Sequence, residues 1–228
     1  MRNVQEMNER GAPVMRGLAR PVLVSSIFFM VVTGIAYPLA TTGVAQLVFR
    51  DQAKGSLVER GGKAVGSAVI GQNFTKPEYF HPRPSTTVGA DPADSSKTVD
   101  QPYNAASSGA SNQGAISKKL IDQVAARAEA YRKENGLAPN APVPVDAVTA
   151  SGSGLDPEIS VANAKLQIQR VAKARGVSPD QISTLLAQQT SQRQLGVLGD
   201  PRVNVLQLNL ALDASIKAQP SAAQPAAR

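Results

Sequence analysis

The feature that most constrains this chain is a long segment without charge near its start. Residues 21–49, PVLVSSIFFMVVTGIAYPLATTGVAQLVF, contain no acidic or basic side chain and lie between Arg20 and Arg50. About 20 apolar residues suffice to cross the hydrocarbon core of a bilayer as a helix. The apolar core of a cleaved signal peptide usually has about 7–15 residues and ends at a small-x-small site. No such site follows here, so we predict one uncleaved transmembrane helix over residues 21–49, with a kink or an interfacial exit near Pro38.

The orientation of this segment is not decided by charge, because basic residues occur in similar number on its two sides. They are Arg2, Arg10, Arg16 and Arg20 before it, and Arg50, Lys54, Arg60 and Lys63 after it. A short tail before a first apolar helix usually stays inside, whereas a large following domain is exported largely regardless of charge. We therefore expect residues 1–20 to form a flexible cytoplasmic tail and residues 50–214 to form an extracytoplasmic domain.

Within residues 50–214 the sequence predicts a mixture of helices and short strands. Gly61-Gly62 indicates a turn, and three prolines exclude a regular helix over residues 76–85. Apolar spacing and end signals predict helices over residues 116–135, 157–175 and 178–189, and a short strand over residues 145–150. Residues 202–213 fit a strand or a helix. The fold class is therefore an α/β (mixed α+β) soluble domain anchored by one transmembrane helix. The Ala/Pro-rich residues 215–228 are expected to be disordered.

Composition excludes several function classes. There is no cysteine and one histidine, so the chain has neither a thiol nucleophile nor a His-rich metal cluster. The net charge of +7 is spread among acidic residues, which disfavours a nucleic-acid surface. A lone His81 beside prolines is more often a packed or hydrogen-bonding residue than a base, because a base needs a nucleophile and an orienting partner. We predict no catalytic residues and no metal site.

Two loops rich in glycine and serine could bind an anion. In the first, Gly152-Ser-Gly154 is followed by Pro157, where the dinucleotide-binding fingerprint needs a third glycine. We expect a structural turn or protein contact there, with Asp156 capping a helix that starts at Pro157; a phosphate site is the alternative. In the second, residues 103–114, a solvated loop or protein interface competes with an anion site before the helix that follows.

Several blocks of the sequence together resemble one protein family. They are YPLATTGVAQLVF, GSAVIGQNFTKPEYFHPRPS, YNAASSGASNQG, VPVDAVTASGSGLDPEIS, QRVAKARG and LGDPRVNVLQLNLALD, in this order. They look like the KdpC subunit of the bacterial Kdp potassium-transporting P-type ATPase, over nearly the whole chain from Arg20 to Asp213. One departure is Ala110, where the family often has a further glycine.

The resemblance implies a non-catalytic, single-pass accessory subunit in the bacterial inner membrane. Its partners would be the potassium-binding, channel-like subunit and the ATP-hydrolysing subunit of a high-affinity uptake pump. The chain lacks the phosphorylated Asp-Lys-Thr-Gly-Thr motif and a potassium filter, which fits that role. The family is described as a catalytic chaperone that raises the pump's ATP affinity. ATP is therefore the implied cofactor, through the partner subunit or through contacts with Ser108, Gly109, Ser111, Asn112 and Gln113.

We expect the surface that contacts partner proteins to be formed by polar and small residues of three loops. The candidates are Tyr79, Arg83, Ser85, Tyr103, Asn104, Ser151, Gly152, Ser153 and Gly154. The alternative function is a membrane-anchored binding or scaffold domain of the cell envelope, unrelated to ATP. An exported hydrolase is disfavoured, because the sequence offers no nucleophile–base pair.

Overall fold

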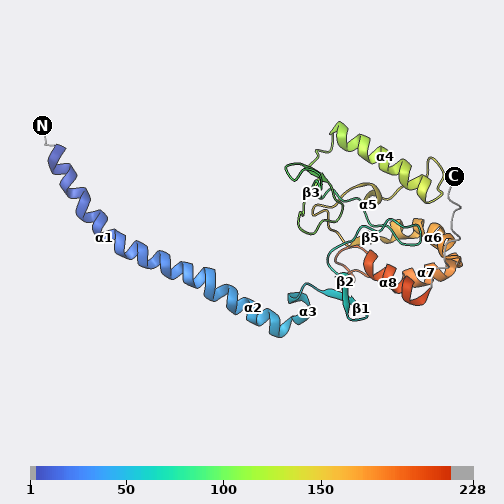
Figure 1. The fold of residues 1–228 in the computed structure, drawn as a ribbon, viewed down its shortest axis with the longest axis horizontal. Coiled ribbons are helices and arrows are strands. Elements are labelled where there is room, and N and C mark those ends of the chain that lie inside the picture. Colours follow the sequence, from blue (N-terminus) through green and yellow to red (C-terminus); the bar gives the residue numbers. More distant parts are fainter. Residues whose placement is uncertain (1–3, 217–228) are drawn as a thin grey trace. The chain divides into compact units, whose positions relative to one another are not determined.

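The chain divides into two compact units between Ser56 and Leu57. The computed structural model describes residues 4–216, and Figure 1 shows the ribbon of both units. Residues 217–228, which make up most of the tail predicted to be disordered, lie outside the described residues, as do residues 1–3.

The first unit is almost entirely helical. It consists of α1 (Val4–Val31), a π-helical turn (Val32–Ala36), α2 (Tyr37–Val48) and the short α3 (Arg50–Ala53). Residues Gly17–Val48 form one continuous apolar helix, long enough to cross a membrane; its most apolar 18-residue stretch has a mean hydropathy of 2.1, and none of that stretch is buried in the structure. The flexible tail expected for residues 1–20 is wrong from Val4 onward, because those residues are helical. Extending a formed helix costs far less than nucleating a new one.

The π-helical turn lies just before Pro38 and has a local cause. Proline has no N–H, and its ring clashes with the carbonyl four residues earlier, here that of Gly34. The helix adapts by widening, so that the Tyr37 N–H donates to the Val32 carbonyl. Thr33 donates to the Phe29 carbonyl (2.6 Å) and Thr41 to the Tyr37 carbonyl (3.0 Å). The hydroxyls of these threonines are thus satisfied within the segment, as a hydrocarbon environment requires.

The second unit is a mixed α+β domain, as predicted. Its strands are β1 (Leu57–Arg60), β2 (Lys63–Ser67), β3 (Val88–Ala90), β4 (Thr98–Asp100), β5 (Glu158–Ser160), β6 (Thr190–Ser191) and β7 (Arg202–Asn204). Its helices are α4 (Lys118–Glu134), α5 (Val145–Val148), α6 (Val161–Arg175), α7 (Pro179–Gln188) and α8 (Val205–Ser215).

The strands form three small antiparallel sheets. Strands β1 and β2 pair through a two-residue turn in which Gly61 and Gly62 both have positive φ (+59° and +77°), so the predicted turn is confirmed. Strands β3 and β4 form a second hairpin, and the third sheet has the order β5-β7-β6. The core lies between this third sheet and helices α6, α7 and α8, and its fully buried members include Phe80, Ile159, Val171, Ile182, Val203, Leu208 and Leu212.

Helix ends with local signals were predicted well. Helix α4 ends before Gly136 (φ +64°), and α6 ends at Gly176 in the left-handed conformation (φ +66°). Ser178 and Gln181 form a reciprocal capping box at the start of α7. The ambiguous residues 202–213 contain both elements: β7 ends at Asn204, whose side chain then caps α8 by accepting from the Gln207 N–H.

Two predicted elements are wrong. The strand expected over residues 145–150 is the short helix α5, because a brief apolar run does not distinguish a strand from a buried helical turn. The helix expected from Pro157 begins at Val161, after strand β5. Its N-cap is Ser160, which accepts from the Asn163 N–H, so Asp156 does not cap α6.

Candidate functional site

The proline-rich segment of residues 76–85 is the backbone of the candidate site. Its prolines deprive it of regular sheet pairing, so side-chain amides replace a partner strand. Asn209 accepts from the Phe80 N–H (2.8 Å) and donates to the Phe80 carbonyl (3.0 Å). Gln167 does the same for His81, at 2.7 and 3.1 Å. Both amides are buried on core helices, so they fix the direction in which the next residues leave the core.

Arg83 and Tyr103 connect this segment to the loop that follows α5. The Arg83 guanidinium donates to the Asp156 carboxylate at 2.7 Å and to the Thr149 carbonyl at 3.4 Å. The Tyr103 hydroxyl donates to the Arg83 carbonyl at 2.8 Å. Burial raises the pKa of the Tyr103 phenol, and the charge of Asp156 adds to the rise, so the hydroxyl keeps its proton and remains a donor.

The two loops rich in glycine and serine pack against each other, and we call this contact the glycine–serine junction (residues 85–87, 107–111 and 151–155). The Gly109 N–H donates to the Ser153 carbonyl at 2.9 Å, and the Ser108 hydroxyl donates to the same oxygen at 3.1 Å. Ser85 donates to the Gly154 carbonyl at 2.7 Å. These contacts occupy the backbone N–H and hydroxyl donors that a bound phosphate would need.

Gly154 is the tightest point of the glycine–serine junction. It is buried with φ +68°, and its N–H donates to the Ser151 hydroxyl at 2.8 Å. A Cβ atom placed there would lie 2.6 Å from the Thr87 methyl and 2.8 Å from the Gly109 carbonyl oxygen. Only glycine combines this backbone conformation with so close an approach, which supports the structural reading of the loop.

Other residues singled out from the sequence lie around this junction or away from it. Asn104 donates to the Val88 carbonyl at 2.8 Å and so ties the second loop to strand β3. Gln113 donates to the Ser111 carbonyl and accepts from Ser117, just before α4. Gly152 and Asn112 are exposed. Tyr79 lies elsewhere, against the core.

Tyr79 packs on a buried arginine rather than on the loops. Its hydroxyl donates to Asp213 at 3.2 Å, and the Arg175 guanidinium lies 5.1 Å from the centre of its ring. Arg175 is itself fully buried, donating to the Asp213 carboxylate (2.9 Å) and to the carbonyls of Glu78 and Ile216. This cluster fixes the end of α8 against the start of the proline-rich segment.

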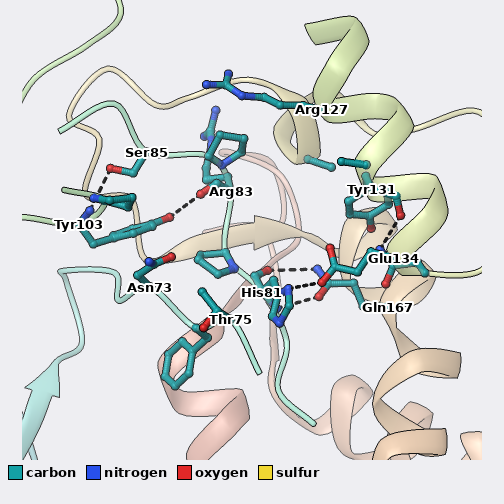
Figure 2. Close-up of a pocket in the computed structure, with 17 residues that line it drawn as sticks. Asn73, Thr75, His81, Arg83, Ser85, Tyr103, Arg127, Tyr131, Glu134 and Gln167 are labelled. Atoms are coloured by element: carbon teal, nitrogen blue, oxygen red, sulfur yellow. Dashed lines mark hydrogen bonds and ion pairs between the residues drawn. The ribbon is translucent and has the colours of Figure 1, made fainter. Parts of the chain in front are cut away.

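A cleft of about 380 Å³ lies between the proline-rich segment and α4 (Figure 2). Arg83, Ser85 and Tyr103 line one part of it, and Arg127, Tyr131 and Glu134 of α4 line another. Sequence reasoning missed this cleft. The signal was that residues 127, 131 and 134 recur at i, i+4 and i+7 and therefore share one face of the helix.

His81 crosses the cleft and links its two walls. Its Nδ1 atom lies 2.6 Å from Glu134 Oε1, and its Nε2 atom lies 2.9 Å from the Lys76 carbonyl oxygen. Both neighbours are acceptors, so the doubly protonated ring satisfies both contacts and a neutral ring only one. The hydrogen bond from His81 lowers the pKa of the Glu134 carboxyl. His81 is thus a hydrogen-bonding residue, as predicted.

The arrangement offers contacts for a ligand or a partner but no nucleophile paired with a base. Ser85, the serine of the cleft lining, donates its hydroxyl proton to the Gly154 carbonyl and does not contact His81. Within residues 4–216 no group of three or more metal-ligating side chains is found.

Comparison with known proteins assigns this combination of an apolar helix and an α+β domain to one family. Residues 19–214 match the family described as "KdpC: K+-transporting ATPase, c chain". A potassium-transporting ATPase KdpC subunit of Rhodopseudomonas palustris (strain TIE-1) is 59% identical over 196 residues, covering 86% of this chain and 96% of that protein. The subunits of Methylobacterium nodulans and Mycobacterium bovis are 55% and 54% identical, over 85% and 87% of this chain and 95% and 99% of their own lengths.

Proposed function

The chain belongs to the KdpC family of potassium-transporting ATPase subunits, and we propose that it is the accessory subunit of a high-affinity, ATP-driven potassium uptake pump. The observation that carries the proposal is the extent of the family match, residues 19–214, which includes both the apolar helix and the α+β domain. We further propose that it assembles with a channel-like subunit that binds potassium and with a subunit that hydrolyses ATP.

The apolar helix supports membrane anchoring. Residues Gly17–Val48 have the length and hydropathy of a membrane span, and their side chains are exposed in the isolated chain. We propose that this helix crosses the bacterial inner membrane once, with the N-terminus in the cytoplasm and residues 57–216 outside. Protease added to intact spheroplasts would then cut the exposed β3–β4 hairpin at Lys97, whose side chain is 73% exposed. Protection of Lys97 until the cells are lysed would reverse this topology.

Exposed apolar side chains at one hairpin tip support a partner surface. Leu195, Val197 and Leu198 lie between β6 and β7 and are 90%, 73% and 57% exposed. Single exposed apolar residues are ordinary, but three at one tip are typical of a contact with another protein. We propose that this tip contributes to assembly together with the loop residues predicted from the sequence.

The effect on ATP is proposed to act through the partner subunit. An extracytoplasmic domain does not meet cytoplasmic ATP, so a chaperone effect has to be transmitted through assembly. The glycine–serine junction supports this view, because Ser108 and Gly109 already bond to Ser153. Gln113, another residue considered for direct nucleotide contact, also has its side chain engaged, because it donates to the Ser111 carbonyl and accepts from the Ser117 hydroxyl.

Co-purification from membranes tests the assembly proposal. The tagged chain, extracted in mild detergent, should retain large polytopic partners, and a Leu195→Asp variant should retain less of them. Val145 is also exposed (73%) and lies away from this tip in the sequence, so Val145→Asp is the matched control and should retain them fully. Recovery of the wild-type chain without polytopic partners would favour the alternative, an anchored scaffold domain of the cell envelope.

A further inference from the structure

Two arginines from different elements meet at one edge of the cleft. Arg127, on α4, donates to the Val148 carbonyl at 3.2 Å. Arg83, on the proline-rich segment, donates to the Thr149 carbonyl through Nε and Nη2, each at 3.4 Å. Val148 and Thr149 are consecutive, so the two guanidiniums are anchored side by side at the end of α5. Figure 2 shows them directed toward the same corner.

The negative charge at this corner balances only one of the two arginines. Asp156 lies 2.7 Å from Arg83. Glu134, the carboxylate in the lining of the cleft, is bound to His81 at 2.6 Å and lies 3.9 Å from Arg170. Among the ion pairs within residues 4–216, none involves Arg127. The corner therefore carries an excess positive charge in a half-buried setting, where charge interactions are stronger than in water.

Arg127 also has donors to spare. A guanidinium carries five N–H donors in a rigid fork that matches an oxyanion, and one of them is used here, toward Val148. The cleft beside it holds about 380 Å³ and is lined by Pro82, Pro84 and Tyr131 among others. Apolar walls with a few convergent polar groups are the usual composition of a small-molecule site.

We propose that this cleft binds a small oxyanion, a carboxylate or a phosphate, which bridges Arg83 and Arg127. Charge-assisted and bidentate hydrogen bonds to two guanidiniums would hold the anion and remove the repulsion between them. The site is distinct from residues 108–113, which were considered for nucleotide contact and do not line the cleft. It goes beyond the proposed pump function, because it concerns a ligand of this chain itself.

Titration calorimetry on the full chain in detergent tests the site, with inorganic phosphate and succinate as separate probes at constant ionic strength. At least one probe should give saturable binding, and which one binds identifies the class of anion. Arg127→Gln should weaken that binding by about tenfold or more, the usual effect of losing charged hydrogen bonds. Arg127→Lys, which keeps the charge but not the fork, should give an intermediate loss.

Arg132→Gln is the matched control. Arg132 lies on the same helix and also donates to a backbone carbonyl outside it, that of Ala141 at 2.8 Å, but it does not line the cleft. Its replacement should leave anion binding unchanged. Thermal unfolding of each variant verifies that it is folded. If Arg127→Gln does not fold, the loss of anion binding is measured on Arg127→Lys instead. The absence of saturable binding to both probes in the wild-type chain, or an equal loss in Arg132→Gln, would overturn the proposal.

Discussion

Replacing Gly154 by alanine tests whether the glycine–serine junction holds the domain together. An L-residue in the left-handed conformation costs about 1–2 kcal/mol. The new Cβ would also lie 2.6 Å from the Thr87 methyl and 2.8 Å from the Gly109 carbonyl oxygen, both closer than real Cβ contacts. Relieving such overpacking typically costs a further 1–3 kcal/mol, roughly. We therefore expect Gly154→Ala to lower the free energy of unfolding by about 2–5 kcal/mol.

Gly136→Ala separates these two contributions. Gly136 has nearly the same φ (+64°), yet a Cβ there meets nothing within 4 Å. Gly136→Ala should therefore lower the free energy of unfolding only by the cost of the left-handed backbone conformation, about 1–2 kcal/mol. The effect of alanine on the unfolded chain is common to both variants and cancels in their difference. The difference between the two losses of stability, about 1–3 kcal/mol, then measures the packing cost of a Cβ atom in the glycine–serine junction.

The assay is urea unfolding of the full chain in detergent, followed by the near-ultraviolet circular dichroism of tyrosines, since the chain has no tryptophan. A Thr87→Ser background removes the methyl group but keeps the hydroxyl that donates to the Gln101 carbonyl (2.6 Å). Gly154→Ala should cost less in that background, which a double-mutant cycle measures. Equal losses for Gly154→Ala and Gly136→Ala, with no coupling to Thr87, would refute the reasoning.

Three further predictions follow from other contacts. Because the pKa of Glu134 is lowered on folding, its stabilising effect is complete above the ordinary value of about 4.3 and is lost as the pH falls. The Glu134 side chain is 40% exposed. Glu134→Gln should therefore lower the free energy of unfolding by about 1 kcal/mol or less near neutral pH, and the urea unfolding curves of the variant and the wild type should coincide in acid. Asp156→Ala should cost more, about 1–3 kcal/mol in the same assay, because it leaves the half-buried Arg83 unpaired; an unchanged midpoint would contradict this. Val31→Arg, near the middle of the apolar helix, should cost about 2.5–3.5 kcal/mol of insertion and release the chain in an alkaline wash; retention in the membrane fraction would count against the single span.

Features that depend on neighbouring residues were predictable from the sequence. The apolar helix follows from its own composition, the C-terminal end of α6 from Gly176, and the start of α7 from its N-cap Ser178. The Gly61-Gly62 turn is equally local, because both residues adopt positive φ. In each case the signal and the structure lie within a few residues of each other.

Features that depend on distant contacts were not predictable. Asp156 was taken for a helix cap, yet it pairs with Arg83, and α6 begins only at Val161, after strand β5, with Ser160 as its N-cap. The pairing of His81 with Glu134 joins segments whose spacing carries no periodic signal. Sequence patterns report which residues share a face, but not which face of another element they meet. The cleft therefore became visible only in the folded chain.

Potassium-dependent ATPase activity tests the central claim most directly. The pump complex would be purified with and without this chain, and activity measured as a function of ATP concentration. We predict that adding the purified chain to the complex lacking it restores potassium-stimulated activity and lowers the ATP concentration that gives half-maximal rate. Identical activity and identical ATP dependence with and without the chain would contradict its role as an accessory subunit of the pump.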